Sequence, residues 1–415
     1  MKATVITIGN ELLSGRTLDL NFAFLARALA EAGVRVVRHF TVGDERPAML
    51  AAVRAAETDS ELVVLSGGLG PTADDLTREV MAELAGVPLV ENRELAERLA
   101  ARAATLGRPL THVARRQALL PAGVETLPNP VGEAPGLWIE RQGRVVCALP
   151  GVPGELQAMT RESLMPRLRT RAGVGVAVQA VTLRTLGISE AVIAQRIEDD
   201  AVDLTGVELA YLPQAAGVDL RIVGAGADAA RAVARVEAAL AERFAAAIYA
   251  RGEETIEEVV FRLLRERGLK LAVAESCTGG LVGYRVTRVP GSSEVFVGGV
   301  VAYADAIKAS ELGVPAELIT AAGAVSAETA VAMAEGAIAR LGADVGLAVT
   351  GIAGPGGGSE AKPVGLVFIG LAGRGGASVS RRLQLPGDRH QIRERASALA
   401  LECLRRFLLG SLQAG

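Results

Sequence analysis

The sequence predicts an α/β protein with two three-layer α/β domains, whose sheets are parallel-rich, joined by a small α+β module. Half of the 415 residues are hydrophobic, yet only 3% are aromatic. The excess consists of Ala, Val, Leu and Gly, a composition that suits helices packed closely on parallel strands. Short apolar runs alternate with helical patterns in the first and last parts of the chain, and the order changes between them. We expect domains at residues 1–170, 171–251 and 252–415, within the two to four that about 150 residues per domain would give.

The first domain alternates strands and helices. Strand-like runs and helical patterns follow one another at short intervals: strands at 4–8, 34–40 and 62–66, and helices at 21–33, 47–57 and 76–85. This spacing is typical of a doubly wound parallel sheet.

The middle module reads as strand, helix, two short strands and a long Ala-rich helix. The expected ranges are 176–184, 189–198, 207–211, 218–223 and 227–247. The order resembles that of a KH-type RNA-binding domain, but no G-x-x-G loop with basic flanks is present. We therefore expect a spacer or dimerisation module without direct nucleic-acid binding.

The last domain begins with a helix and returns to alternation. The expected strands are 269–274, 295–303, 345–350, 365–371 and 378–385, and further helices fill 279–287, 326–341 and 389–409. The two α/β domains share no evident repeat, so each can carry its own site.

Charge and targeting signals exclude several classes of protein. The formal net charge is −3 and the basic residues are scattered, so no nucleic-acid affinity is indicated. Cys147, Cys277 and Cys403 lie far apart and form no C-x-x-C pair, which argues against a zinc site or a disulfide framework. The opening run M-K-A-T-V-I-T-I-G is too short for a signal peptide, and no apolar run approaches the roughly 18 residues needed to span a membrane. We expect a cytoplasmic protein.

The stretch A-E-S-C-T-G-G follows a predicted strand and opens a helix. The free amides of a first helical turn can bind an anion or an oxyanion, and glycines let the backbone approach a ligand. Ser276 or Cys277 could therefore be a nucleophile, although G-x-S-x-G is absent. Taken alone, the stretch is explained better as a capped helix start, because such caps are far commoner than nucleophiles.

Three other features surround this turn in the predicted sheet. Lys308 follows the next strand and could act as a base if burial or cationic neighbours lowered its pKa, but a lone lysine is usually a solvated surface group. The loop T-G-I-A-G-P-G-G-G (350–358) suits close backbone contact with a ligand, and it lacks the lysine of a P-loop. Arg389 and Arg393 open the last helix and could clamp a phosphate or form surface ion pairs.

These runs, together with V-P-G-S-S (289–293), G-G-V-V-A-Y-A-D-A-I-K (298–308) and K-P-V-G (362–365), resemble the C-terminal domain of the CinA family. The resemblance implies a nicotinamide mononucleotide (NMN) deamidase of the Ser/Lys type that needs no cofactor. It assigns Ser276 as nucleophile and Lys308 as general base, with Ser293 and Tyr303 in support. Cys277 becomes a packed bystander. The implied substrate contacts are Thr278, Gly279, Gly280, Thr350, Gly351, Gly354 and Arg389, with the amides of 278–280 helping to hold the oxyanion.

In the first domain, the run E-L-V-V-L-S-G-G-L-G-P-T-A-D-D-L-T-R (61–78) delivers a glycine loop and two aspartates to a strand end. Glycines expose amides to phosphate, whereas Asp74 and Asp75 suit a phosphate site only when a divalent cation intervenes. Either aspartate could instead be an N-terminal acid favoured by the helix dipole. Glu11, Asp44 and Glu155 also follow strand ends, so we expect the acids to converge on one crevice.

These runs, with N-P-V-G-E-A-P-G (129–136), resemble the molybdopterin-binding (MoeA/MogA-like) fold and the N-terminal domain of full-length CinA proteins. The resemblance implies a divalent-metal-dependent ADP-ribose pyrophosphatase, using Mg²⁺ or Co²⁺ with K⁺ as a further candidate ion, that yields AMP and ribose 5-phosphate. The implied metal ligands are Glu11, Asp44, Asp74, Asp75 and Glu155. The implied substrate contacts are Asn10, Gly67, Gly68, Gly70, Thr72, Pro150 and Gly151. Glu133 departs from the pattern, which has a small hydroxyl residue there.

Two other functions remain open from the sequence. The protein could be a ligand-binding or scaffold protein with a molybdopterin-like module, or an enzyme that retains only one of the two activities. The resemblance also implies a homodimer with NMN and ADP-ribose as its small-molecule partners. Ammonia release from NMN and AMP release from ADP-ribose would separate these alternatives.

Overall fold

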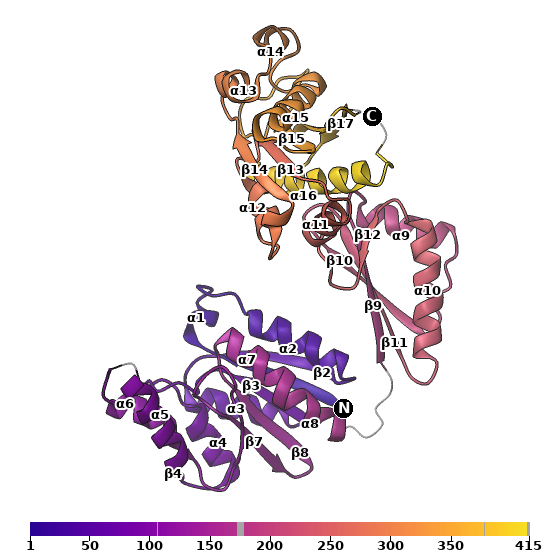
Figure 1. Ribbon diagram of the computed structural model, residues 1–415. Coiled ribbons are helices and arrows are strands. Elements are labelled where there is room, and N and C mark those ends of the chain that lie inside the picture. The colour runs from indigo at the N-terminus through magenta and orange to yellow at the C-terminus, as the bar shows by residue number, and fades with distance from the viewer. Residues whose placement is uncertain (106, 172–177, 377, 413–415) are drawn as a thin grey trace. The chain divides into compact units, whose positions relative to one another are not determined.

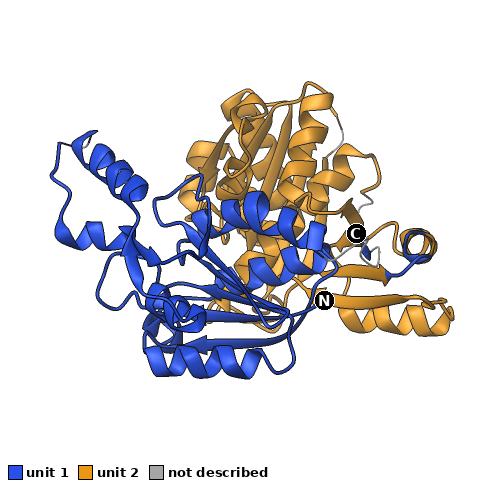
Figure 2. Cartoon of the chain, turned by 90° about the horizontal axis from the view of Figure 1, so that it is seen from below, with its two compact units in different colours: residues 1–179, 225–230 blue, residues 180–224, 231–415 orange. Residues whose placement is uncertain are grey.

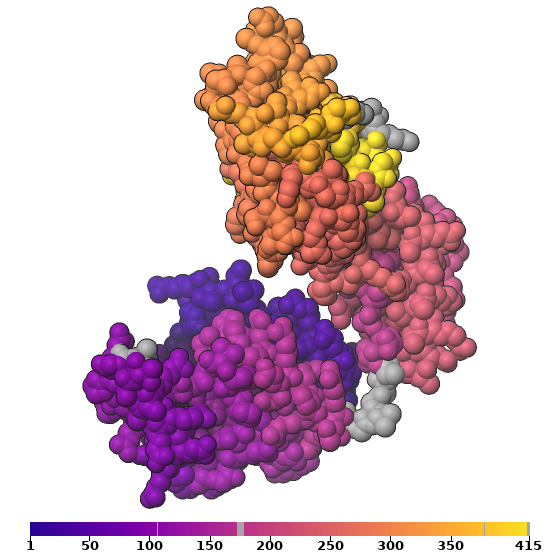
Figure 3. All heavy atoms as spheres, viewed as in Figure 1, coloured from indigo at the N-terminus to yellow at the C-terminus, as the bar shows by residue number. Residues whose placement is uncertain are grey.

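The computed structural model describes residues 1–105, 107–171, 178–376 and 378–412. The chain forms two compact units, one of Met1–Gln179 with Ala225–Ala230 and one of Ala180–Gly224 with Arg231–Gly415 (Figures 1 and 2). Figure 3 shows the surface of both units in the view of Figure 1. None of the helices in the described ranges is both long enough and apolar enough to cross a membrane.

The first unit is built on a six-stranded sheet with the order β2-β1-β3-β8-β7-β6. Its strands are β1 (Lys2–Ile8), β2 (Arg35–Val42), β3 (Leu62–Ser66), β6 (Glu125–Leu127), β7 (Gly136–Arg141) and β8 (Arg144–Leu149). The first four strands in this order are parallel, and the β7–β8 and β6–β7 pairs are antiparallel. β4 (Leu89–Glu91) and β5 (Leu119–Pro121) form a separate two-stranded antiparallel sheet.

Helices cover both faces of this sheet because alternate strand residues are apolar on both sides. In β1, Val5 packs in the core with α2, α7 and α8, whereas Ile6 packs in the core with α3, α4 and α5. The helices are α1 (Asn10–Leu13), α2 (Leu20–Glu31), α3 (Arg46–Ala56), α4 (Thr77–Ala85), α5 (Arg93–Thr105), α6 (His112–Arg115), the 3₁₀ turn η1 (Arg116–Ala118), α7 (Pro153–Met159), the π-helical turn η2 (Thr160–Leu164) and α8 (Met165–Arg171). The predicted three-layer α/β arrangement is confirmed.

The second unit contains most of the small module and the whole of the last α/β domain. The module has a four-stranded sheet, order β10-β11-β9-β12, made of β9 (Val178–Thr185), β10 (Val207–Pro213), β11 (Val218–Ala225) and β12 (Ile248–Arg251), with α9 (Glu190–Asp199) and α10 (Ala229–Arg243). The expected order of elements is confirmed. The first two residues of the strand predicted at 176–184 lie outside the described residues.

The last domain has a five-stranded sheet with the order β14-β13-β15-β16-β17. The strands are β13 (Leu271–Glu275), β14 (Phe296–Val301), β15 (Val345–Gly351), β16 (Leu366–Gly373) and β17 (Ser378–Gln384). β13 is parallel to β14 and β15, whereas β16 and β17 form an antiparallel meander with β15. The parallel strands therefore end at one edge of the sheet, which is the edge that ligands favour in open α/β folds.

Two cores lie on the two faces of this sheet. Val273 packs with α11, α12 and α16, and its neighbours Ala272 and Ala274 pack with α13 and α15. The helices are α11 (Ile256–Glu266), α12 (Leu281–Thr287), η3 (Ser292–Glu294), α13 (Asp305–Leu312), α14 (Ala316–Ala322), α15 (Ala327–Leu341) and α16 (Arg389–Leu408). The predicted helix at 279–287 starts two residues later, because Gly279 and Gly280 take positive φ angles of 61° and 96° that a helix cannot contain.

Candidate functional site

Ser276 lies in the turn between β13 and α12. Its backbone N–H donates to the carbonyl of Val349 at 2.9 Å, which ties the turn to the end of β15. The side chain is largely buried, with 8% of its surface exposed, and among the described residues its hydroxyl has no hydrogen-bond partner. The turn therefore presents an uncommitted hydroxyl at the carboxyl edge of the parallel strands.

Glu275 holds the start of α12 in place. Its buried carboxylate accepts hydrogen bonds from the amides of Gly280 (3.0 Å), Val282 (3.0 Å) and Gly283 (2.8 Å). The amide of Gly279 donates to the Ser276 carbonyl at 3.1 Å. The expectation that the Gly279 and Gly280 amides hold an oxyanion is therefore wrong for this arrangement, because both have acceptors already.

Two amides of the turn remain for a ligand. In the described part of the chain, the N–H groups of Cys277 and Thr278 donate no hydrogen bond to another residue. The Thr278 hydroxyl is also buried without a partner. A buried polar atom without a partner costs about 1–3 kcal/mol, so these groups favour a bound ligand with polar atoms.

Lys308 approaches the same sheet edge from α13. After β14, the Ala302 amide donates to the Glu275 carbonyl at 2.8 Å, which brings the following residues beside the turn. Lys308 is 1% exposed, and its Nζ donates to the Tyr303 carbonyl at 3.2 Å and to Asp305 Oδ1 at 3.1 Å. A lysine is rarely fully buried unless its charge is paired, and Asp305 supplies the partner here.

Two arginines from the first turns of α16 face this turn and the glycine loop. Arg389 donates to the carbonyl of Gly354 at 2.7 Å and to the Tyr303 hydroxyl at 2.9 Å. Arg393 donates to the Thr278 carbonyl at 2.8 Å, and its Nε is buried without a hydrogen-bond partner. Arg389 thus joins the glycine loop to Tyr303, and both cations stand beside the candidate nucleophile.

Thr350 and Gly351, at the start of the glycine loop, hold the loop against neighbouring segments. Thr350 is completely buried, and its hydroxyl donates to the Ala324 carbonyl at 2.7 Å. Gly351 ends β15 where a Cβ would lie 2.7 Å from the Leu366 carbonyl oxygen. The Thr350 hydroxyl therefore anchors the loop before α15, and its predicted contact with substrate stays a prediction. Lys362, whose Nζ donates to Ala322 and Val325, anchors the same loop.

Cys277 is the alternative nucleophile, and its surroundings disfavour that role. Burial raises the pKa of its thiol to about 11, against a smaller lowering by the charges of Arg393 and Arg389. A thiol with this pKa is protonated at neutral pH, and the thiolate is the reactive form. The side chain is 5% exposed and packs in the core with Val273 and Val282.

Ser293 lies at the other end of the sheet. It is an exposed residue of η3, next to Val295, whose carbonyl accepts a hydrogen bond from the amide of Leu271 at the start of β13. Ser276 follows the end of that strand, and five strand residues span roughly 16 Å. The expectation that Ser293 supports Ser276 within the same chain is therefore wrong.

In the first unit, the glycine loop follows β3. Gly67 has φ 117° and approaches the end of β1 so closely that a Cβ would lie 2.5 Å from the Ile8 carbonyl oxygen. Asp75 accepts hydrogen bonds from the amides of Gly70 (2.9 Å) and Thr72 (2.8 Å) and from the Thr72 hydroxyl. Asp75 and Thr72 thus brace the loop, which leaves fewer of their polar atoms for a metal or a substrate.

Arg78 was missed by the sequence analysis and also shapes this loop. It is 2% exposed, and its Nη1 donates to the carbonyls of Leu69 (2.7 Å) and Gly70 (2.8 Å). These two hydrogen bonds fix the carbonyl groups of the loop. The position of Arg78 in the first turn of the helix that follows the glycine loop could have indicated this role from the sequence.

We expect Arg78→Met to lower the free energy of unfolding of the first unit by about 1–3 kcal/mol, because two buried carbonyls lose their donor. Calorimetric unfolding of the full chain measures this change. Arg98→Met, which removes an exposed arginine of α5, serves as the control and should leave the unfolding unchanged. Equal stability of the two variants would contradict this role for Arg78.

The acidic residues of the first unit divide between two cavities. One cavity of about 440 Å³ is lined by Gly68, Gly70, Asp75, Pro150, Gly151 and Glu155, among others. A second, of about 150 Å³, is lined by Glu11 and again by Gly151. Glu155 accepts a hydrogen bond from Asn129 at 2.7 Å, and Asp74 is exposed. Glu11 and Glu155 therefore line different cavities, although Gly151 borders both.

A subset of the acids still lies close together. Asp44 accepts a hydrogen bond from the Asn10 amide at 3.0 Å, so the predicted contact Asn10 supports an acid through its backbone. Burial raises the pKa of the Asp44 carboxyl, and the charges of Glu11, Asp74 and Asp75 raise it further. Such repulsion favours a cation, but in the ranges that the structure describes no three His, Cys, Asp or Glu side chains are placed to hold a metal.

Glu133, the departure from the expected pattern, lines the larger cavity and pairs with Arg102. The Nη1–Oε1 distance is 2.6 Å. A hydroxyl residue could not form this ion pair, so the cavity wall here carries a positive and a negative group together.

Three family models match this sequence. They are described as a CinA C-terminal domain (residues 253–408), a probable molybdopterin binding domain (residues 4–170) and a damage-inducible protein CinA KH domain (residues 181–250). A CinA-like protein of Gemmatimonas aurantiaca is 44% identical over 98% of this chain and 96% of its own length. A putative competence-damage inducible protein of Symbiobacterium thermophilum is 46% identical over 99% of this chain and 100% of its own length.

A solved structure of a CinA protein from Thermoplasma acidophilum, described as of unknown function, is 39% identical. It covers 40% of this chain and 97% of its own, with a TM-score of 0.37.

Proposed function

Since this chain belongs to the CinA family along nearly its whole length, we propose that its C-terminal domain hydrolyses the amide of NMN to nicotinate mononucleotide and ammonia. One observation carries the proposal. The free hydroxyl of Ser276 and the buried amine of Lys308 stand at the same sheet edge, next to Arg389 and Arg393. Amide hydrolysis needs a nucleophile, a base and an oxyanion site, and a phosphate-bearing substrate suits the arginines.

In the proposed reaction, Lys308 in its neutral form accepts the Ser276 hydroxyl proton while Oγ attacks the carboxamide carbon. The carbonyl electrons move to oxygen, and the amides of Cys277 and Thr278 are the candidates to stabilise that charge. The C–N bond then breaks, and the proton passes from Lys308 to the departing nitrogen, which leaves as ammonia. Water hydrolyses the resulting ester, Lys308 takes its proton, and Ser276 recovers a proton as the carboxylate leaves.

Ammonia and nicotinate mononucleotide should appear in equal amounts when the purified protein is given NMN. The assay should succeed after exhaustive treatment with a chelator, because none of these steps needs a metal. Absence of both products at neutral and mildly alkaline pH would reject the amidase.

The first unit supports a second candidate function, the hydrolysis of ADP-ribose to AMP and ribose 5-phosphate. The observation that favours it is the raised pKa of Asp44 beside three further acids, next to a glycine loop. Mg²⁺ is usually held by one or two carboxylates together with substrate phosphates, so a preformed cage is unnecessary. Asp44 and Glu11 would hold such an ion, or Co²⁺, and the ion would neutralise diphosphate charge. K⁺ remains a further candidate ion.

We expect AMP release from ADP-ribose to require an added divalent cation, and Asp44→Asn to reduce it by at least about tenfold, since a neutral amide cannot offset the cation's charge. Release is measured by chromatography with Mg²⁺, with Co²⁺ and with a chelator. Asp199→Asn, at the end of α9 in the other unit, is the control and should release AMP like the unaltered protein. Full activity of Asp44→Asn would show that Asp44 does not hold the cation.

The competing function is a binding or scaffold role with a molybdopterin-like module. Failure of both assays in one preparation would favour it, and success of one alone would favour a protein with a single activity. We also propose a homodimer, which sedimentation equilibrium would test, and no direct contact with nucleic acid.

A further inference from the structure

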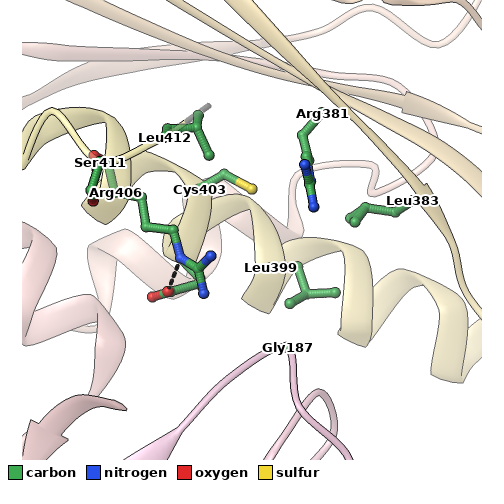
Figure 4. A pocket seen from close by; sticks show the side chains of 9 residues that line it. Gly187, Arg381, Leu383, Leu399, Cys403, Arg406, Ser411 and Leu412 are labelled. Atoms are coloured by element: carbon green, nitrogen blue, oxygen red, sulfur yellow. Dashed lines mark hydrogen bonds and ion pairs between the residues drawn. The ribbon is translucent and has the colours of Figure 1, made fainter. Parts of the chain in front are cut away.

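A cavity outside the proposed sites lies in the second unit, on the C-terminal half of α16. Its volume is about 250 Å³, and it is bounded by β17, by α16 and by the turn at Gly187 (Figure 4). Leu186 belongs to the same core as Leu401 and Leu404, so this turn packs directly on the helix. Neither the amidase nor the pyrophosphatase uses any residue of this cavity.

One side of the cavity is cationic. Arg381 points into it from β17, and among the described residues it forms no hydrogen bond or ion pair (Figure 4). Arg406 donates from Nε to Glu402 at 2.6 Å, but the same carboxylate also accepts two hydrogen bonds from Arg405, at 2.7 and 2.9 Å. The single negative charge of Glu402 is thus shared by the guanidinium groups of Arg405 and Arg406. Together with Arg381, these groups give the region a net positive charge.

The other side is apolar. Leu383 from β17 and Leu399 from α16 contribute apolar side chains to the lining (Figure 4). Cys403 adds to this wall, because burial raises the pKa of its thiol to about 12 and keeps it neutral. Arg381 and Arg406 line the same cavity as this thiol.

A second cavity, of about 530 Å³, shares Gly187 and Arg406 with the first. It adds Arg196 and Arg243 beside Phe244. Arg243 is paired with Asp200 at 3.0 Å, and no partner of Arg196 is found among the described residues. Positive charge next to an apolar surface therefore continues beyond the first cavity.

We propose that the cavity at Arg381 and Arg406 binds a small phosphomonoester that carries an apolar or planar group. A phosphate dianion offers three acceptor oxygens, which match two planar guanidinium groups better than a single carboxylate does. The organic group would lie against Leu383 and Leu399, where its burial adds to the binding energy. This inference does not depend on either proposed activity.

The test uses phenyl phosphate as the probe and isothermal titration calorimetry on the full chain. We expect a Kd below about 1 mM for the unaltered protein and at least about tenfold weaker binding for Arg381→Met. Arg382→Met is the matched control, because it removes the next arginine of β17, which does not line the cavity, and it should bind like the unaltered protein. Inorganic phosphate alone should bind more weakly than phenyl phosphate.

Three results would overturn the proposal. They are no binding by the unaltered protein, equal binding by Arg381→Met, and binding of inorganic phosphate as tight as that of phenyl phosphate. A loss of binding in Arg389→Met with none in Arg381→Met would likewise reject it, because the probe would then occupy the candidate amidase site. Arg381 is exposed, so its substitution should not prevent folding, and thermal unfolding of each variant checks this.

Discussion

Ser276→Ala is expected to lower kcat/KM for ammonia release from NMN by about 10⁴-fold, because the acyl-transfer step loses the atom that forms the covalent bond. The fold should survive, since the Ser276 hydroxyl makes no hydrogen bond in the described chain and its backbone bond to Val349 is retained. Ammonia release measures the loss, and NMN binding by calorimetry should persist in the variant.

Cys277→Ala is the matched control. The thiol has a pKa of about 11 and is buried, so at neutral pH it contributes packing and no nucleophile. We expect this variant to keep most of its activity. Retained activity in Ser276→Ala with loss in Cys277→Ala would reverse the assignment of the nucleophile.

Lys308→Met should lower kcat by about 10²–10⁴-fold, the usual contribution of a positioned general base. Methionine has a similar length and is apolar, so it can occupy the buried space. Asp305 is more than half exposed and can be solvated when its partner is removed. Lys270→Met, at the opposite end of β13, is the control and should leave kcat unchanged.

A second substitution separates a base from a structural cation. Arginine keeps the positive charge but cannot be deprotonated in a protein. Lys308→Arg should therefore be as inactive as Lys308→Met. Retention of more than about a tenth of the activity would show that the charge matters and that another group accepts the proton.

The sequence predicted well those features that depend on the alternation of strands and helices. The α/β class and the three-layer arrangement follow from apolar periodicity, and the same periodicity placed the residues after β13, β14 and β15 at one edge. The antiparallel direction of β16 and β17 did not follow, because the apolar pattern of a strand reads the same in either direction.

The side-chain hydrogen bonds of the sites could not be predicted. Glu275, Asp75 and Thr350 each have polar atoms that could face a ligand, and the structure shows them bound to the protein's own backbone or loops. The choice depends on backbone geometry at single residues, which residue spacing does not encode. Ser293 precedes β14, which runs parallel to β13, whereas Ser276 follows β13. The two serines therefore lie at opposite ends of the sheet. The motif V-P-G-S-S does not reveal this separation.

The contact between Glu275 and α12 has a consequence for the cost of binding substrate. Three amides of the helix start are held by a carboxylate that belongs to the preceding strand, so the turn of Ser276 is ordered before any ligand arrives. The entropy lost in arranging this turn is then part of folding, and binding need not supply it. Under the proposed amidase activity, the binding energy of NMN is then available for orienting its carboxamide.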